Sequence, residues 1–324
     1  MTKLFVNLAR VGTLLALLVV AVGAWVRLTD AGLGCPDWPG CYGQLIVPEV
    51  LSAEAASDPS LAARPLEPEK AWNEMIHRYM ASTLGFICLV LAGLAWRNRA
   101  HPDQPTKVPY TLLALVIFQG LLGMWTVTLL LKPVIVAAHL IGGMSTLSLL
   151  FWLSRFRTAP IWSGDKLKAL AVAATVVLGV QIFLGGWTSA NYAALACPDF
   201  PTCQTQWWPE IADFDEGFVM WRGLGIDYEG GVLEHPARVA IHFVHRLGAV
   251  LAAILLAWLA IRLIAQPSSR PDGTAMALAL FAQLSIGIGI VLLGVPLSVA
   301  VAHNAIAALL LLTVINAHRR IWQS

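Results

Sequence analysis

Eight stretches of about 20 apolar residues limit the possible folds of this chain more than any other feature. A helix needs about 20 such residues to cross the hydrocarbon core of a bilayer. Only 12% of the 324 residues are charged, which argues against a soluble enzyme. The sequence therefore predicts an all-α membrane protein with eight transmembrane helices. The first is expected to be retained, because no signal-peptide cleavage site follows it. The predicted spans are about 6–27, 75–96, 109–130, 134–154, 168–188, 239–264, 274–294 and 297–317.

The distribution of charge predicts the orientation of these spans. Lys and Arg gather in the short loops and at the chain ends on one side, which is typical of the cytoplasmic face. The two long loops, about 28–74 and 189–238, each hold eight Asp or Glu and are expected in the periplasm of a bacterium with an inner membrane. No carboxylate is expected deep in the bilayer, which argues against an ion-coupled transporter. The net charge of +2 is too small to indicate nucleic-acid binding.

The second half of the chain repeats the first. A Trp is followed by two Cys, then by a His-Arg pair, and then by a Gln that lies 20 residues before a second His. The landmarks are Trp25, Cys35, Cys41, His77, Arg78, Gln119 and His139, followed by Trp187, Cys197, Cys203, His245, Arg246, Gln283 and His303. The repeat predicts two tandem four-helix bundles, 1–157 and 165–324. Each bundle begins and ends inside, so a pseudo-two-fold axis along the membrane normal should relate them.

Each half carries two histidines inside predicted helices, near the outer surface. They are His77 and His139 in the first half and His245 and His303 in the second. Two imidazoles that face each other across a four-helix bundle suit axial ligation of a haem iron. Zinc or copper would require three or four nitrogen or sulfur ligands in one cluster. The pattern therefore indicates a haem site in each half.

Three neighbours of these histidines allow two interpretations each. Arg78 and Arg246 could neutralise haem propionates, or could extend to the membrane interface. His242 lies one turn before His245 and could be an alternative iron ligand, or a residue that supports the ligand.

The outer cysteines form two pairs with the same spacing. Cys35 with Cys41 and Cys197 with Cys203 are expected to form structural disulfides in an oxidising compartment. A redox-active role is the alternative, although the spacing differs from the Cys-x-x-Cys of thiol oxidoreductases. Cys88 is expected to be a buried packing residue.

The two halves differ one turn before the first histidine, where the first half has Glu74 and the second has His242. Glu74 could be a solvated carboxylate at a helix N-terminus. It could also act as a general base beside a bound haem. The asymmetry suggests that the first half performs chemistry and the second carries a cofactor.

Together, these residues resemble the haem A synthase family of bacterial and mitochondrial membranes. The matching segments cover nearly the whole chain and are 32–41, 74–78, His139, 196–203, His245 with Arg246, and His303. The resemblance implies stepwise oxidation of the methyl group at porphyrin position 8 of haem O to a formyl group. The product would be haem A, the prosthetic group of certain terminal oxidases.

The resemblance also implies roles for individual residues. His245 and His303 would ligate haem b, the substrate haem O would lie near His77 and His139, and Glu74 would be the essential acid. Cys35 and Cys41 would form the family's first outer cysteine pair. Water can serve as the oxygen source, because removing electrons from the macrocycle makes the methyl carbon electrophilic and Glu74 can take the proton of the attacking water.

Two other functions share some of these features. A dihaem b-type electron-transfer subunit oxidising quinol would use the four histidines, but it does not call for the cysteine loops or Glu74. A membrane disulfide-generating protein would use the cysteines but not the histidines. The sequence leaves open the electron acceptor, the oligomeric state, the role of the long acidic first loop, and contacts with the haem O-producing enzyme and oxidase assembly factors.

Overall fold

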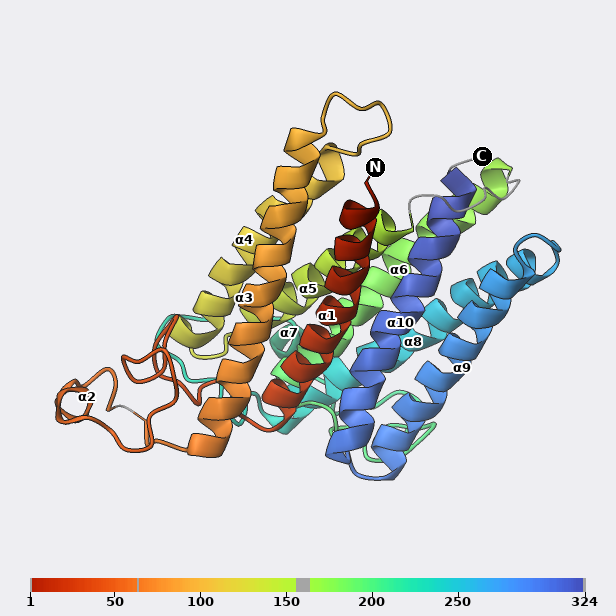
Figure 1. Ribbon diagram of the computed structural model, residues 1–324. Helices are drawn as coiled ribbons and strands as arrows, with labels where there is room; N and C mark the ends of the chain where they lie inside the picture. The colour runs from red at the N-terminus through yellow and green to blue at the C-terminus, as the bar shows by residue number, and fades with distance from the viewer. Residues whose placement is uncertain (1, 63, 156–163, 323–324) are drawn as a thin grey trace.

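The computed structural model describes residues 2–62, 64–155 and 164–322, which form ten helices (Figure 1). Two are short, α2 (Ala53–Ser57) and α7 (Phe214–Gly217), and both lie in the long loops. The other eight are long and apolar enough to cross a membrane, which confirms the all-α fold and the predicted number of spans. They are α1 (Lys3–Leu28), α3 (Pro68–Arg97), α4 (Lys107–Thr128), α5 (Pro133–Ser154), α6 (Asp165–Ala190), α8 (His235–Ile264), α9 (Arg270–Leu292) and α10 (Leu297–Trp322).

Most of the long helices begin earlier than the apolar pattern predicted, and for α3 and α8 the early start is at the end that carries the long loops. Helix α3 begins at Pro68 rather than near residue 75, and α8 begins at His235 rather than near residue 239. Both have a proline in the first turn, where its missing N–H and fixed φ suit a helix start. Their first turns are polar, so a hydropathy criterion places the start too late. The outer ends of both helices therefore project from the apolar region towards the long loops.

The eight long helices form two groups of four. In the first group α1 packs on α3 and α5, and α4 packs on α3 and α5; in the second, α6 packs on α8 and α10, and α9 packs on α8 and α10. The groups meet through α1 and α5 against α6 and α10. Exchanging the halves reproduces this set of contacts, as expected for the predicted pseudo-two-fold relation. Residue 157, the predicted end of the first half, lies outside the described residues, so the limits of the halves stay predictions.

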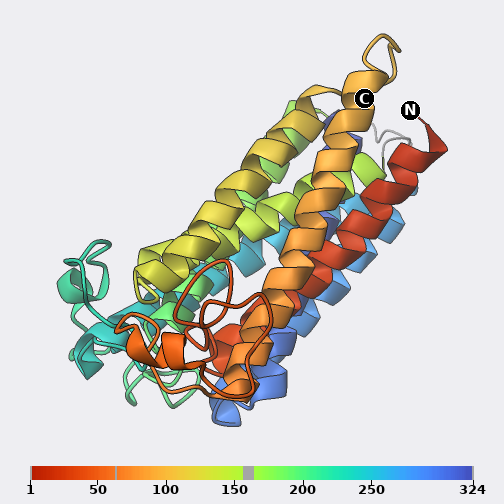
Figure 2. The same ribbon diagram turned by 60° about the vertical axis from the view of Figure 1, so that its left-hand side comes forward.

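The described part of the chain places both ends together and both long loops together. The chain ends lie at one end of the helices (Figure 1), and the loops around α2 and α7 lie at the other (Figure 2). This agrees with the predicted topology, whereas the side that faces the cytoplasm stays a prediction.

One large apolar core joins the two halves. It contains Phe5 and Ala9 of α1, Leu150 of α5, and Leu259 and Val314 of the second half, all of them fully buried. These residues lie towards the end of the bundles that carries the chain termini. The four histidines lie closer to the opposite end, beyond this core, where smaller apolar clusters pack beneath the long loops.

Two glycines of α9 predict opposite effects on stability. A Cβ at Gly273 would lie 2.6 Å from the carbonyl oxygen of Ala260, a backbone atom of α8, whereas Gly289 has nothing within 4 Å. Gly273→Ala should therefore destabilise the protein by about 1–3 kcal/mol through overpacking. Gly289→Ala should raise stability by up to about 1 kcal/mol, because alanine favours helix. Thermal unfolding in detergent micelles measures both, and a Gly273→Ala midpoint equal to wild type would contradict this packing.

Candidate functional site

The four predicted ligand histidines lie as two pairs, one in each bundle. The imidazole of His77 on α3 lies close enough to that of His139 on α5 for the two rings to interact electrostatically. His245 on α8 lies in the same relation to His303 on α10. The structure therefore brings together the residues that the repeat assigned to each half, and it keeps the two pairs in separate bundles.

A glycine from a neighbouring helix lies against the Cε1 edge of each of these imidazoles. A Cβ at Gly23 would lie 2.9 Å from His77, and one at Gly287 would lie 3.0 Å from His303. The corresponding separations are 3.6 Å for Gly123 and His139, and 3.3 Å for Gly185 and His245. The two tighter positions leave no room for a side chain, and all four bring backbone close to the ring. The glycines thus let each imidazole pack closely against the backbone of the neighbouring helix.

These features fit a haem in each half. Among the described residues no group of three or more His, Cys, Asp or Glu could hold a metal ion, whereas each half offers two imidazoles. The Nδ1 atoms of His77, His139 and His303 are buried and have no hydrogen-bond partner among the described residues. Unpaired buried polar atoms of this kind call for an explanation, and they leave these three rings without a protein partner at Nδ1.

The outer cysteines form the predicted disulfides, Cys35–Cys41 and Cys197–Cys203. All four side chains are at most 1% exposed. The two loops have the same internal structure, because an aspartate in each accepts backbone N–H groups of the turn. Asp37 accepts from Tyr42 and Gly43, and Asp199 accepts from Gln204 and Thr205. Each loop is thus a compact cap over the outer end of its own bundle.

The arginine that follows each first histidine points into the disulfide loop of its own half. Arg78 Nη1 donates to the carbonyl oxygens of Asp37, Pro39 and Gly40. Arg246 Nη1 donates to the carbonyl oxygens of Asp199 and Thr202, and its Nη2 donates to that of Cys197. Both guanidinium groups therefore fasten a loop to a helix, a role that the sequence did not predict. Their positive charges still lie at the outer end of each bundle, one position from a candidate ligand.

Glu74 and His242 occupy the same place in the two halves. The carboxylate of Glu74 accepts the Cys35 N–H at 2.8 Å and an N–H of Arg78. In the second half, His242 Nδ1 faces the Cys197 N–H and its Nε2 faces the Arg246 Nε–H, each at 3.2 Å. Glu74 is only 5% exposed, so it is not the solvated carboxylate that was one of its two interpretations. His242 contacts the loop, which favours the interpretation that it supports its half rather than binding iron.

The long loop of the second half also covers the first half. Lys132 is only 2% exposed, and its ammonium group donates to the carbonyl oxygens of Arg222 and Gly223, each at 2.8 Å. The Tyr228 N–H donates to the carbonyl oxygen of Leu130 at 3.1 Å. The outer end of the first bundle is therefore built from both halves of the chain.

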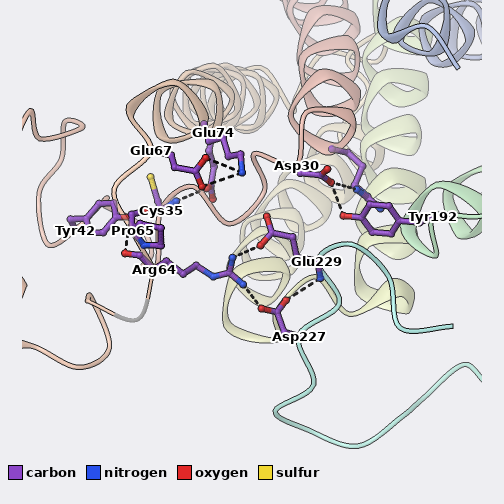
Figure 3. A network of polar contacts seen from close by, with 12 residues as sticks. Asp30, Cys35, Tyr42, Arg64, Pro65, Glu67, Glu74, Tyr192, Asp227 and Glu229 are labelled. Carbon is purple, nitrogen blue, oxygen red and sulfur yellow. Dashed lines mark hydrogen bonds and ion pairs between the residues drawn. The ribbon is translucent and has the colours of Figure 1, made fainter.

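Ion pairs and a hydrogen bond complete this cover (Figure 3). Arg64 of the first long loop pairs with Asp227 and Glu229 of the second, and the Tyr192 hydroxyl donates to Asp30 at 2.6 Å. These contacts join the acidic loops of the two halves at the outer end.

Known proteins match this chain over nearly its whole length. The sequence model of a family described as cytochrome oxidase assembly protein matches residues 7–315. The haem A synthase of Shewanella oneidensis is 44% identical over 320 residues, which cover 97% of this chain and 96% of the relative. The haem A synthase of Rhizorhabdus wittichii is 32% identical over 318 residues, which cover 90% and 87%. The chain belongs to the haem A synthase family. The family assignment made from the motifs is thus confirmed, while the roles of individual residues stay predictions.

Two kinds of residue in this haem A synthase family member were not predicted from the sequence, namely the glycines beside the imidazoles and Gln181. The four glycines stand at matching points of the repeats, two residues before each Trp and four after each Gln of the landmarks, so the repeat contained their signal. Gln181, which contacts His245, has no counterpart in the first half and carried no such signal.

Arg78→Met should expose one disulfide and not the other. A buried disulfide reacts with a reductant only after local opening. Losing a charged hydrogen bond costs about 1.5–3 kcal/mol, so reduction of Cys35–Cys41 should accelerate about tenfold or more, while Cys197–Cys203 keeps its wild-type rate. Arg246→Met should give the reverse pattern. Alkylation of freed thiols followed by mass spectrometry measures both rates, and equal acceleration of both disulfides in either variant would contradict the separate anchoring.

Proposed function

We propose that this protein oxidises the methyl group at porphyrin position 8 of haem O to a formyl group, giving haem A. The first half would bind the substrate, and the second would carry haem b. The observation that carries this assignment is the difference at one equivalent position, where Glu74 has the partners that His242 has in the other half. A carboxylate can take a proton from water beside a substrate, and only the first half offers one there.

The proposed ligands follow from the two histidine pairs. His77 and His139 would hold the iron of haem O, and His245 and His303 would hold the iron of haem b. The glycine beside each imidazole supports this assignment. Arg78 and Arg246 would place positive charge near the propionates while they hold the loops. The disulfide loops would exclude bulk water from the outer edge of each haem.

Chemistry at the ring periphery does not need an open coordination site on iron. Removal of two electrons and one proton from the methyl group breaks a C–H bond and makes the carbon electrophilic. A water oxygen then forms a bond to that carbon, and Glu74 accepts a proton from the water. The first cycle gives an alcohol, the second gives a geminal diol, and loss of water leaves the aldehyde. A haem bound in the second half would supply one-electron transfer, accepting each electron and passing it to an external acceptor.

The proposed setting is a bacterial inner membrane, with both termini in the cytoplasm and the disulfide loops in the periplasm. The lysines and arginines of the short loops support this orientation. The site would then lie near the periplasmic surface of the membrane. Haem O would reach it from the producing enzyme within the membrane, and haem A would leave towards oxidase assembly factors.

Glu74→Gln should abolish turnover and leave the second-half haem in place. The amide keeps an acceptor oxygen for the Cys35 N–H but cannot take a proton from water. Haem extracted from cells that rely on the variant should contain haem O and lack haem A, and the purified variant should keep the bis-histidine haem absorbance. Glu69→Gln, at an exposed position in the first turn of α3, provides the matched control. Normal haem A in the Glu74→Gln cells would refute the role proposed for Glu74.

The oxygen of the intermediate alcohol should come from water. Turnover in oxygen-18 water should label the alcohol in haem extracts, and labelled dioxygen should not. Mass spectrometry of the alcohol measures this more cleanly than that of the aldehyde, because the aldehyde exchanges its oxygen with water. Label supplied only by dioxygen would rule out addition of water assisted by Glu74.

A further inference from the structure

Gln181 on α6 contacts the imidazole that is proposed to hold haem b. Its Nε2 lies 3.1 Å from His245 Nδ1 and donates to the His245 carbonyl oxygen at 3.0 Å. One side chain therefore touches both the ring and the backbone of the same residue. Gly185, one turn further along α6, lies against Cε1 of that ring. Two adjacent turns of α6 thus fix the rotation of the His245 ring.

The space for this amide is provided by a glycine on the facing helix. A Cβ at Gly248 of α8 would lie 2.3 Å from Gln181 Oε1. That oxygen is buried and has no hydrogen-bond partner among the described residues. A half-turn of the amide exchanges its oxygen with its NH₂ group. The same side chain can therefore donate to an unprotonated Nδ1 and to the His245 carbonyl oxygen. After the half-turn it gives up the carbonyl contact and can accept from the Nδ1–H of a ring that binds metal through Nε2.

The first half has the opposite combination of side chains. The repeat places Val19 where the second half has Gln181, and Met80 where the second half has Gly248. Gly23 still lies against the ring of His77, as Gly185 does against that of His245. His77 Nδ1, however, is buried without a partner among the described residues. The first half thus has a methionine where the second half has a glycine, and a valine where the second half has a glutamine.

We infer that Gln181, through the room left by Gly248, positions His245 and makes the second half the one that retains its haem. This rests on the proposed function, in which one haem is a cofactor and the other is exchanged as substrate and product. A hydrogen bond to the outer nitrogen of a ligating imidazole fixes its orientation, raises its basicity, and changes metal affinity by about 10–100-fold. Val19 and Met80 cannot donate or accept such a hydrogen bond at His77, so a haem there is released more readily.

A size-matched pair of variants separates hydrogen bonding from packing. In full-length protein purified with its haem, Gln181→Met should speed transfer of the second-half haem to apomyoglobin by about 10–100-fold. It should also shift the midpoint potential of that haem to more positive values, because a less basic imidazole stabilises ferric iron less. Gln181→Glu keeps an acceptor oxygen, so it should retain the haem at close to the wild-type rate. Gln119→Met is the control, since it makes the same change at a partly buried glutamine of the first half.

The reciprocal change tests the other half. In a His245→Ala/His303→Ala background, any retained haem belongs to the first half. Adding Val19→Gln with Met80→Gly should slow loss of added haemin from that half, whereas Val19→Gln alone should not, because Met80 fills the space.

The possible results distinguish failure of the role of Gln181 from failure of the proposed function. If His245→Ala removes no haem from the purified protein, both are wrong. If it removes haem but Gln181→Met and Gln181→Glu have equal loss rates and potentials, only the inference is overturned. If Gln181→Met fails to fold, as shown by loss of both disulfides, the Gln181→Glu rates and the reciprocal variants in the first half decide the question.

Discussion

The structure depends on two arginine side chains that are enclosed by backbone carbonyl groups. A guanidinium group near the hydrocarbon region is costly unless its N–H groups are paired. Arg78 and Arg246 meet this requirement with carbonyl oxygens of the disulfide loops. Each loop is therefore held against the helix that carries the first histidine of its half. The same contacts place Glu74 or His242 beside that loop, so loop, helix and candidate ligand form one rigid unit in each bundle.

The sequence repeat gives the chain this unit twice, and the two copies differ at positions that contact the first histidine or its loop. Both ring nitrogens of His242 face N–H donors, although a neutral imidazole accepts through only one nitrogen. The Glu74 carboxylate accepts from both donors without conflict. The second half has instead gained Gln181 beside His245. One copy thus holds a proton acceptor next to an unsupported ligand, and the other holds a supported ligand with no carboxylate. A division between turnover and retention follows from these differences.

The sequence was sufficient for the spans, the repeat and the histidine pairs, because bilayer thickness fixes helix length and duplication fixes spacing. It was insufficient where contacts join distant segments. The polar first turn of α3 hid the helix start at Pro68. The direction of Arg78 depends on how the loop folds back over the helix. Gln181 is one residue among many in an apolar stretch, and its importance is visible only when α6 and α8 pack together.

The contacts between the loops also limit how independent the two halves can be. Lys132 belongs to the first half, but its buried ammonium group is satisfied by carbonyl oxygens of residues 222 and 223 in the second. Separating the halves would leave that charge buried and unpaired, or expose the apolar cluster around Leu131 and Tyr228. Part of the cover over the proposed substrate site is therefore contributed by the proposed cofactor half. Movement of this part of the second half would therefore change access to the site in the first half. Two independent bundles could not be coupled in this way.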